Sequence, residues 1–329
     1  MTDAQEARIG VVTIGRNEGE RLRKCLLSVV RHAAKVIYVD SGSNDGSVAM
    51  AHSLGVEIVE LDMSTPFTAA RARNEGFRRL CAMDSELNYV QFVDGDCEVV
   101  HGWLSRAAQF LNTHSDVAVV CGRRRECFPE RSVYNMLCDI EWNTPVGLAK
   151  SCGGDAMMRI EAFEQAGGYR DSLIAGEEPE LCVRLRAAGW KLWRLDEEMT
   201  LHDAAITRFG QWWKRAKRCG YAYAEGAYLH GAPPERHRVR ESRRVWTWGL
   251  VIPILTAILF AWLGIPGLLL LLAYPVQVIR LAMRGTLSFR ANWWYALFLA
   301  LGKFPEMTGQ LEFLYNRLSG KTARLIEYK

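Results

Sequence analysis

The composition of the chain changes near residue 245, where long apolar runs begin. From Trp246 to Leu263 the residues are apolar, and a second apolar run follows the stretch GIPG and reaches Ile279. Each run approaches the length of about 20 residues that a helix needs to cross a bilayer. We therefore expect a transmembrane helical hairpin at residues 246–283. The alternative is a buried hairpin of a soluble domain.

The residues that flank the two runs suit a membrane. Tryptophans lie near the ends of the runs, at Trp246, Trp248 and Trp262. Positive charge precedes the first run in ERHRVRESRR and follows the second at Arg280, Arg284 and Arg290. Indole rings favour the membrane interface, and basic loops favour the cytoplasmic side. We therefore expect both outer ends in the cytoplasm, with a basic juxtamembrane linker at residues 231–245.

A third apolar stretch, NWWYALFLALGKF, is shorter and is followed by Pro305. Its length fits an interfacial or re-entrant helix as well as a third span, so both interpretations stay open. We assign residues 284–329 to this helix and a basic C-terminal tail.

Composition excludes several classes of protein. Of the 329 residues, 49% are hydrophobic and 24% are charged, which excludes a disordered or fibrous chain. The net charge is only +4 and the basic clusters flank apolar segments, so we expect no nucleic-acid partner. Nine cysteines without a CxxC pair favour buried thiols of a reducing compartment over a disulfide framework or a zinc site. No signal peptide is evident in MTDAQEARIGVV, which agrees with a cytosolic location of the cysteine-bearing part.

Short β-branched runs alternate with helical stretches before residue 230. The strand-like runs are RIGVVTIG, KVIYVD, VEIVEL and YVQFVD, and stretches such as RLRKCLLSVVRHA lie between them. This alternation indicates βαβ units, hence an α/β fold with a mostly parallel sheet and helices on both faces. In such sheets the ligand binds at the carboxyl ends of the strands.

Three strand ends carry polar residues: GRNE at 15–18, DSGSNDGS at 40–47 and DGDCE at 94–98. Each alone is ordinary turn chemistry. Together they gather carboxylates along one edge, which is costly unless a cation or ligand donors balance the charge.

Asp94 and Asp96 stand two apart in an extended stretch and point the same way, so both can reach one Mg²⁺ or Mn²⁺ ion. The chain has no phosphate loop of the GxxxxGK[ST] type. Phosphates would then be held mainly through the metal and through arginines, of which Arg71 and Arg73 are nearest.

In their order and spacing, these motifs of residues 9–230 resemble the family 2 glycosyltransferases, which are inverting nucleotide-sugar enzymes with the GT-A fold. The resemblance implies a Rossmann-like nucleotide-sugar-binding catalytic domain at residues 1–230, followed by C-terminal transmembrane or interfacial helices. VVTIGRNE looks like the first strand and its turn, VDSGSNDGS like the strand that contacts the base, and ARNEG like the Arg-Asn helix start.

The donor site follows from the same resemblance. DGD stands where the family has its DxD motif, which implies that Asp94 contacts the ribose or the metal and that Asp96 ligates the metal. Asp40 would contact the nucleotide base, for which the resemblance favours uracil over guanine. His202 stands where several members of the family have a further metal ligand. The implied nucleotide-sugar-binding residues are Thr13, Asn17, Glu18, Asp40, Arg71, Arg73, Asp94 and Gly95.

The stretch AGEEPELCVRLRAAGW, residues 175–190, looks like the family's Glu-Asp motif. Pro179 is well placed as a first helical residue, so Glu177 and Glu178 would lie at a helix N-terminus. The helix dipole there favours the ionised carboxylate that a general base requires. Glu178 occupies the position usually held by Asp; we favour it as the base and keep Glu177 as the alternative.

Two further stretches resemble the acceptor side. In SCGGDAMMRIEAF, Gly153 and Gly154 would allow close backbone approach, and Asp155 would bind acceptor hydroxyls or serve as a turn residue. FGQWWKRAKRCGYAYAEG is similar to the family's aromatic and basic helix beside the active site. The candidates for stacking on a sugar are Trp212 and Trp213, and the candidates for balancing the diphosphate charge are Lys214 and Arg215. The same helix also fits a membrane surface.

These features predict inverting, metal-dependent transfer of a sugar from a nucleotide-sugar, with UDP favoured, to a lipid-linked acceptor in cell-surface polysaccharide biosynthesis. The catalytic domain would face the cytosol at the cytoplasmic membrane, in contact with membrane lipids. The nearest alternative is a polyprenyl-phosphate glycosyltransferase that makes a lipid-phosphate sugar. Alternatives of other classes are a metal-dependent nucleotidyltransferase and a non-catalytic membrane subunit of a polysaccharide assembly complex.

Overall fold

The computed structural model of the protein describes residues 8–321 and 326. The chain divides into two compact units, Met1–Ala205 and Ile206–Lys329. The first unit ends before residue 230, where the sequence places the end of the catalytic domain. The difference arises because helix α8 (Phe209–His230) packs along the C-terminal helix α13 (Lys303–Ser319) within the second unit.

Within the described residues, nine strands of the first unit form one sheet. The strands are β1 (Ile9–Gly15), β2 (Lys35–Asp40), β3 (Glu57–Glu60), β4 (Tyr89–Asp94), β5 (Cys97–Val99), β6 (Val117–Glu126), β7 (Gly147–Ala149), β8 (Ala156–Arg159) and β9 (Lys191–His202). Their order is β3-β2-β1-β4-β8-β6-β9-β5, and β7 pairs with β9.

The sheet is mixed. Strands β1 to β4 pair in parallel, as the alternating sequence pattern predicts. Strand β8 then enters between β4 and β6 in the antiparallel direction, and β5 and β7 pair antiparallel with β9. Strands β6 and β9 pair in parallel. The prediction of an α/β sheet is therefore confirmed, with parallel pairing from β1 to β4 and a mixture of parallel and antiparallel pairs beyond β4. The antiparallel strands β7 and β8 enter the sheet without a helical crossover between them.

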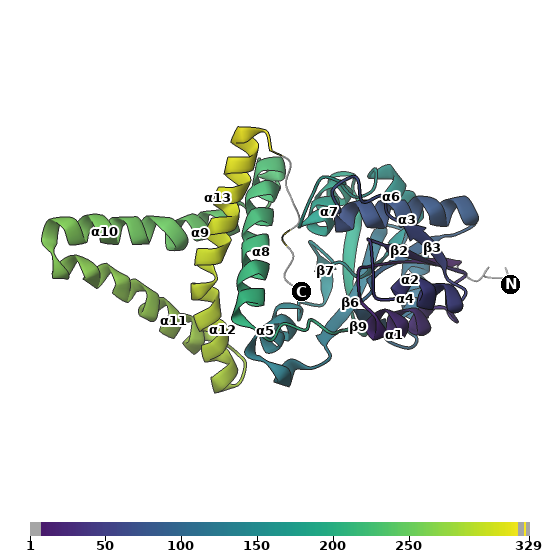
Figure 1. The fold of residues 1–329 in the computed structure, drawn as a ribbon, viewed down its shortest axis with the longest axis horizontal. Helices are drawn as coiled ribbons and strands as arrows, with labels where there is room; N and C mark the ends of the chain where they lie inside the picture. The colour runs from purple at the N-terminus through teal and green to yellow at the C-terminus, as the bar shows by residue number, and fades with distance from the viewer. Residues whose placement is uncertain (1–7, 322–325, 327–329) are drawn as a thin grey trace. The chain divides into compact units, whose positions relative to one another are not determined.

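Helices flank this sheet (Figure 1). They are α1 (Glu20–Val29), α2 (Ser47–Ser53), α3 (Ala69–Met83), α4 (Trp103–Thr113), α5 (Val133–Glu141), α6 (Ile160–Gln165) and α7 (Glu177–Ala187), with a 3₁₀ turn η1 (Pro129–Arg131). Strands β1 and β4 are buried along nearly their whole length, as expected for a sheet covered on both faces.

The register brings the three polar strand ends to one edge of the sheet. Gly15 at the end of β1 is paired with Asp40 at the end of β2, and Ile14 is paired with Asp94 at the end of β4. The motifs that follow these strands therefore start side by side, as the sequence predicts.

The second unit is helical. Besides α8 and α13 it contains α9 (Val239–Trp246), a π-helical stretch η2 (Thr247–Val251), α10 (Ile252–Leu263), a 3₁₀ stretch η3 (Ile265–Leu272), α11 (Ala273–Arg284) and α12 (Phe289–Leu301). The continuous helices Val239–Leu263 and Ile265–Arg284 are long and apolar enough to cross a membrane. In Figure 1 they project from the α8–α13 pair and meet at their far end.

The hairpin has the turn that the sequence predicts, at Gly264, whose φ is 67°. Its apolar side chains are exposed, among them Trp262 and Ile265, which a buried hairpin of a soluble domain would cover. Helix α12 has 13 residues, which is shorter than a membrane span requires.

Helices α8 and α13 pack closely because glycines lie at their contact. A Cβ atom on Gly220 would lie 1.9 Å from the Glu306 carbonyl oxygen, and one on Gly309 would lie 2.0 Å from the Lys217 carbonyl oxygen. The backbones therefore approach each other where a side chain has no room. Lys217 also forms an ion pair with Glu312 across the two helices, at 2.6 Å.

This packing yields a stability prediction. Gly309→Ala should destabilise the helical unit by about 2 kcal/mol or more, because the added methyl group meets backbone that cannot move aside. Gly210→Ala is the matched control: it lies in α8 with no atom within 4 Å of its Cβ position, and should be neutral or slightly stabilising. Apparent unfolding temperatures in detergent measure both, and equal values would contradict the helix contact.

Candidate active site

The DGD turn is held tightly against the first strand. The Gly95 N–H donates to the Ile14 carbonyl oxygen at 2.8 Å, and a Cβ atom on Gly95 would lie 3.0 Å from that oxygen. Glycine therefore lets the turn close over β1. Asp94 and Asp96 on either side are thereby fixed at the carboxyl-end edge of the sheet.

Arg73 of α3 joins two carboxylates from distant parts of the chain. Its guanidinium donates to Asp94 Oδ1 at 2.6 Å and to Glu177 Oε1 at 2.7 Å. The Arg73 side chain is only 3% exposed. A Cβ atom on Gly154 would lie 2.8 Å from Arg73 Nη2, so glycine is needed beside this pair.

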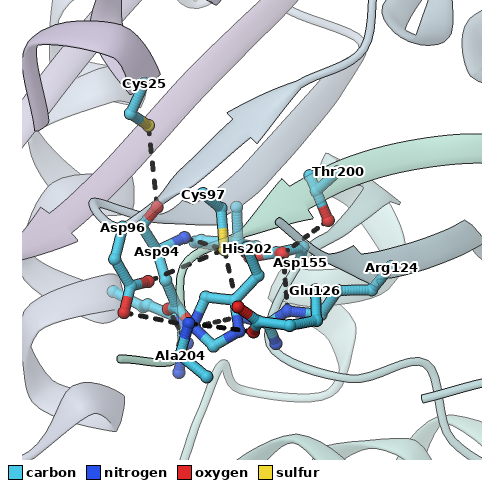
Figure 2. Close-up of polar contacts among 12 residues, drawn as sticks. Cys25, Asp94, Asp96, Cys97, Arg124, Glu126, Asp155, Thr200, His202 and Ala204 are labelled. Atoms are coloured by element: carbon cyan, nitrogen blue, oxygen red, sulfur yellow. Dashed lines mark hydrogen bonds and ion pairs between the residues drawn. The ribbon is translucent and has the colours of Figure 1, made fainter. Parts of the chain in front are cut away.

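A second arginine, Arg124 of β6, contacts the other side of the turn (Figure 2). Arg124 Nη2 lies 3.1 Å from Asp94 Oδ2, and Arg124 Nε lies 3.3 Å from Asp155 Oδ2. Asp155 Oδ1 accepts from the Asp94 N–H at 3.0 Å, and Asp155 Oδ2 accepts from the Thr200 hydroxyl at 2.9 Å. Asp155 thus supports the turn from the position directly before β8, and its predicted contact with an acceptor stays a prediction.

These contacts keep Asp94 ionised. Burial by itself would raise the pKa of the Asp94 carboxyl, but the charges of Arg73 and Arg124 outweigh it and lower that pKa well below its usual range. Both Asp94 oxygens are engaged by arginines, and the predicted contact of Asp94 with the ribose or the metal stays a prediction.

Asp96 and His202 form a separate buried pair at the ends of the DGD turn and β9 (Figure 2). His202 Nε2 lies 3.1 Å from Asp96 Oδ2. Burial, and next the positive charge of Arg124, lower the pKa of His202 to about 3, so its imidazole is neutral at physiological pH. Its Nδ1 atom is buried without a hydrogen-bond partner among the described residues. A carboxylate beside a neutral imidazole fits a divalent metal ion.

The two glutamates at the start of α7 diverge. Helix α7 begins at Glu177, after Gly176 in the left-handed region at φ 79°, so Pro179 is its third residue instead of its first. Both glutamates still lie in the first turn, as predicted. Glu177 forms an ion pair with Arg73, whereas Glu178 accepts hydrogen bonds from the thiols of Cys152 and Cys182.

Glu178 Oε1 accepts three hydrogen bonds. The donors are the Cys152 N–H at 2.5 Å, the Cys152 thiol at 2.9 Å and the Cys182 thiol at 2.9 Å. Burial raises the pKa of the Cys182 thiol to about 11 and that of Cys152 well above its usual value, so both thiols keep their protons.

The loop after β2 is organised by Asp40. Asp40 Oδ1 accepts from the Tyr38 hydroxyl at 2.7 Å, and Oδ2 accepts from the Gly42 and Ser43 N–H groups at 2.9 and 2.8 Å. Asn17, with a positive φ of 55°, accepts from the Asn44 N–H at 2.8 Å and ties the β1 loop to the same turn.

The remaining residues that were predicted to bind the nucleotide-sugar are buried or contact other parts of the protein. Thr13 is fully buried in β1, and Glu18 pairs with Arg21 at 2.7 Å. Arg71 donates to the backbone carbonyls of residues 62, 65 and 66. Their contacts with a nucleotide-sugar stay predictions. So does the acceptor-side role of the residues that lie in α8 of the second unit, which are Trp212, Trp213, Lys214 and Arg215.

Sequence reasoning missed Arg124, Cys152, Cys182 and Thr200. The available signal for Arg124 was a run of three arginines directly after the apolar stretch VAVVCG, because alternate residues of a strand there would face inward. Cys152 directly precedes the glycine pair that the motif comparison singled out. Nothing in the sequence pairs Cys152 with Cys182, which lies 30 residues later.

A family model described as Glycosyl transferase family 2 matches residues 11–165. The succinoglycan biosynthesis protein ExoA of Rhizobium meliloti (strain 1021) is 27% identical over 190 residues, or 54% of this chain and 56% of that protein. The glycosyltransferase AglE of Haloferax volcanii is 24% identical over 227 residues, or 64% of this chain and 71% of that protein. The chain thus spans little more than half the length of the first relative.

Among solved structures, the mannosyltransferase PcManGT from Pyrobaculum calidifontis, in complex with GDP-Man and Mn²⁺, has a similar fold. The TM-score is 0.60 at 16% identity, and the match covers 95% of this chain and 89% of that one. At this identity the likeness shows the fold alone. The predicted fold class, a GT-A domain followed by C-terminal helices, is confirmed.

The arginine bridge yields the second prediction. Arg73→Met should lower the free energy of unfolding by about 3 kcal/mol, because Asp94 and Glu177 lose the buried cation that they share. Arg78→Met is the matched control on the same helix: its exposed ion pair with Glu75, at 3.1 Å, should be worth less than about 1 kcal/mol. Urea denaturation in detergent measures both, and an Arg73 variant as stable as the control would contradict the bridge.

Proposed function

Because residues 11–165 match the model of the family 2 glycosyltransferases, which the sequence motifs resemble, we propose that this chain transfers a sugar from a nucleotide-sugar to a lipid-linked acceptor, with inversion. The observation that carries the proposal is the convergence of five carboxylates at one edge of the sheet. They are Asp94, Asp96, Asp155, Glu177 and Glu178. Asp96 lies beside His202 and Glu178 lies beside two cysteine thiols, and the proposal gives these two carboxylates separate chemistry.

Asp96 and His202 are the residues that would hold a divalent ion, Mg²⁺ or Mn²⁺. Such an ion would neutralise the charge that develops on the leaving nucleoside diphosphate. Asp94, ionised and fixed by two arginines, would then face the ribose, as the family resemblance implies.

Glu178 is the proposed general base. Among the described residues its contacts all go to Oε1, which leaves Oε2 to take the proton of the acceptor hydroxyl. The acceptor oxygen then attacks the anomeric carbon from the face opposite the diphosphate, which inverts the configuration. Glu177 is held by Arg73, so proton uptake there would break a buried ion pair; this favours Glu178.

The base-contacting role of Asp40 fits its hydrogen bonds. A carboxylate has about four acceptor positions, and Asp40 uses three of them within its own loop. The remaining position on Oδ1 is available for an N–H group of a base such as uracil.

The acceptor is proposed from the helical hairpin. Two helices able to cross a membrane would keep a catalytic domain at the surface where lipid-linked sugars are present. The relative named for succinoglycan biosynthesis supports a place in cell-surface polysaccharide assembly. In this proposal the chain lies in the cytoplasmic membrane with its catalytic domain in the cytosol.

Calorimetric titration of the detergent-solubilised protein with UDP, GDP and CDP tests the donor site. We expect one nucleotide, UDP by the family resemblance, to bind at least about tenfold more tightly with Mn²⁺ than without it. Asp96→Asn should abolish this metal effect, whereas Asp62→Asn, at an exposed aspartate of the same unit, should retain it. Absence of nucleotide binding by folded protein would favour the non-catalytic membrane subunit.

A further inference from the structure

Two thiols and a carboxylate meet at one point of the proposed active site. The Sγ atoms of Cys152 and Cys182 lie 3.8 Å apart, and each lies 2.9 Å from Glu178 Oε1. The three donor atoms come from the loop after β7 and from two successive turns of α7. Cys182 and Glu178 are buried, and Cys152 is partly exposed.

The separation of the sulfur atoms matches a tetrahedral zinc site. Two sulfurs each about 2.3 Å from a tetrahedral zinc ion lie about 3.8 Å apart. A carboxylate oxygen about 2.0 Å from the same ion would lie about 3.5 Å from each sulfur. Glu178 Oε1 would therefore move outward by roughly 0.6 Å, which side-chain rotation can supply.

The ligand set selects a different class of cation from the Asp96–His202 pair. Thiolates prefer soft or borderline ions such as Zn²⁺, while Mg²⁺ and Mn²⁺ prefer carboxylate and water oxygens. Three protein ligands leave the fourth zinc position for water, as in catalytic zinc sites. The partly exposed Cys152 provides the side from which an ion would enter.

We propose that Cys152, Cys182 and Glu178 form a zinc site that switches the transferase off. Zn²⁺ would bind the two sulfurs and Oε1, and the two thiol protons would pass to solvent. The bound carboxylate could then no longer take a proton from the acceptor. The inhibitory effect rests on the proposed function, whereas the binding site does not.

Titration of the reduced, detergent-solubilised protein with Co²⁺ alone tests the site directly. A cobalt ion on two thiolates gives a stronger sulfur-to-metal charge-transfer absorption than the Asp96–His202 site can give, because Cys97 is the one thiol in the possible metal group there. We expect this band to saturate at one equivalent and to disappear when Zn²⁺ is added. Asp96→Asn should keep the band, because it alters only the other metal site.

Matched cysteine variants locate the ligands. Cys152→Ser and Cys182→Ser should each weaken cobalt binding at least about tenfold and remove most of the band. Cys81→Ser, at a partly buried cysteine of α3, should leave both the band and transfer unchanged. Circular dichroism checks that each variant is folded. Cys152→Ser is expected to disturb the fold less than Cys182→Ser, because Cys152 is partly exposed and Cys182 is buried.

The inhibition is measured as transfer with saturating Mg²⁺ and increasing Zn²⁺. We expect wild type and Cys81→Ser to lose activity at the zinc concentration that displaces cobalt, and Cys152→Ser to resist it relative to its own starting rate. No charge-transfer band in folded wild type, or the same band in both serine variants of the cluster, would overturn the site. Zinc-insensitive transfer would overturn the switch. A band in a protein that never transfers sugar would leave the site intact and refute the proposed function.

Discussion

The buried guanidinium of Arg73 is the contact on which the acidic edge of the sheet depends. It donates to Asp94, at the end of β4, and to Glu177, at the start of α7, from a side chain that is 3% exposed. Without this cation two carboxylates from segments 83 residues apart in sequence, 177 less 94, would repel each other at close range. Arg124 repeats the arrangement with Asp94 and Asp155.

The carboxylates at this edge differ in the groups that they contact. Arginines form ion pairs with Asp94, Asp155 and Glu177, and these ion pairs hold the segments at this edge of the sheet together. Asp96 lies beside a neutral imidazole, and Glu178 lies beside two protonated thiols. In the proposed function, Asp96 would bind a metal ion and Glu178 would take the proton of the acceptor.

The sequence predicted those parts of the site that depend on local pattern. Strand-helix alternation and polar strand ends placed Asp40, Asp94 and Asp96 correctly at one edge, because parallel strands end together. The start of α7 was predicted from Pro179, with Glu177 and Glu178 at the helix N-terminus; the helix begins two residues earlier, and both glutamates lie in its first turn.

The parts that escaped prediction depend on contacts between distant segments. Strand β8 enters the sheet antiparallel beside β4, and this alone places Asp155 against the DGD turn. No local pattern encodes that pairing, or the meeting of Cys152 with Cys182. Likewise, the amphipathic pattern of α8 indicates a buried stripe but not that its partner is α13, about 90 residues later.

We propose that Glu178, and not Glu177, removes the proton from the acceptor in sugar transfer. Single-turnover transfer by Glu178→Gln and Glu177→Gln, at saturating nucleotide-sugar and with lipid-linked acceptor, separates the two glutamates. We expect Glu178→Gln to slow the chemical step by a factor of about 10² to 10⁴ with donor affinity unchanged, and Glu177→Gln mainly to weaken stability and donor binding. Transfer by Glu178→Gln at the wild-type rate, or loss of the chemical step only in Glu177→Gln, would contradict it.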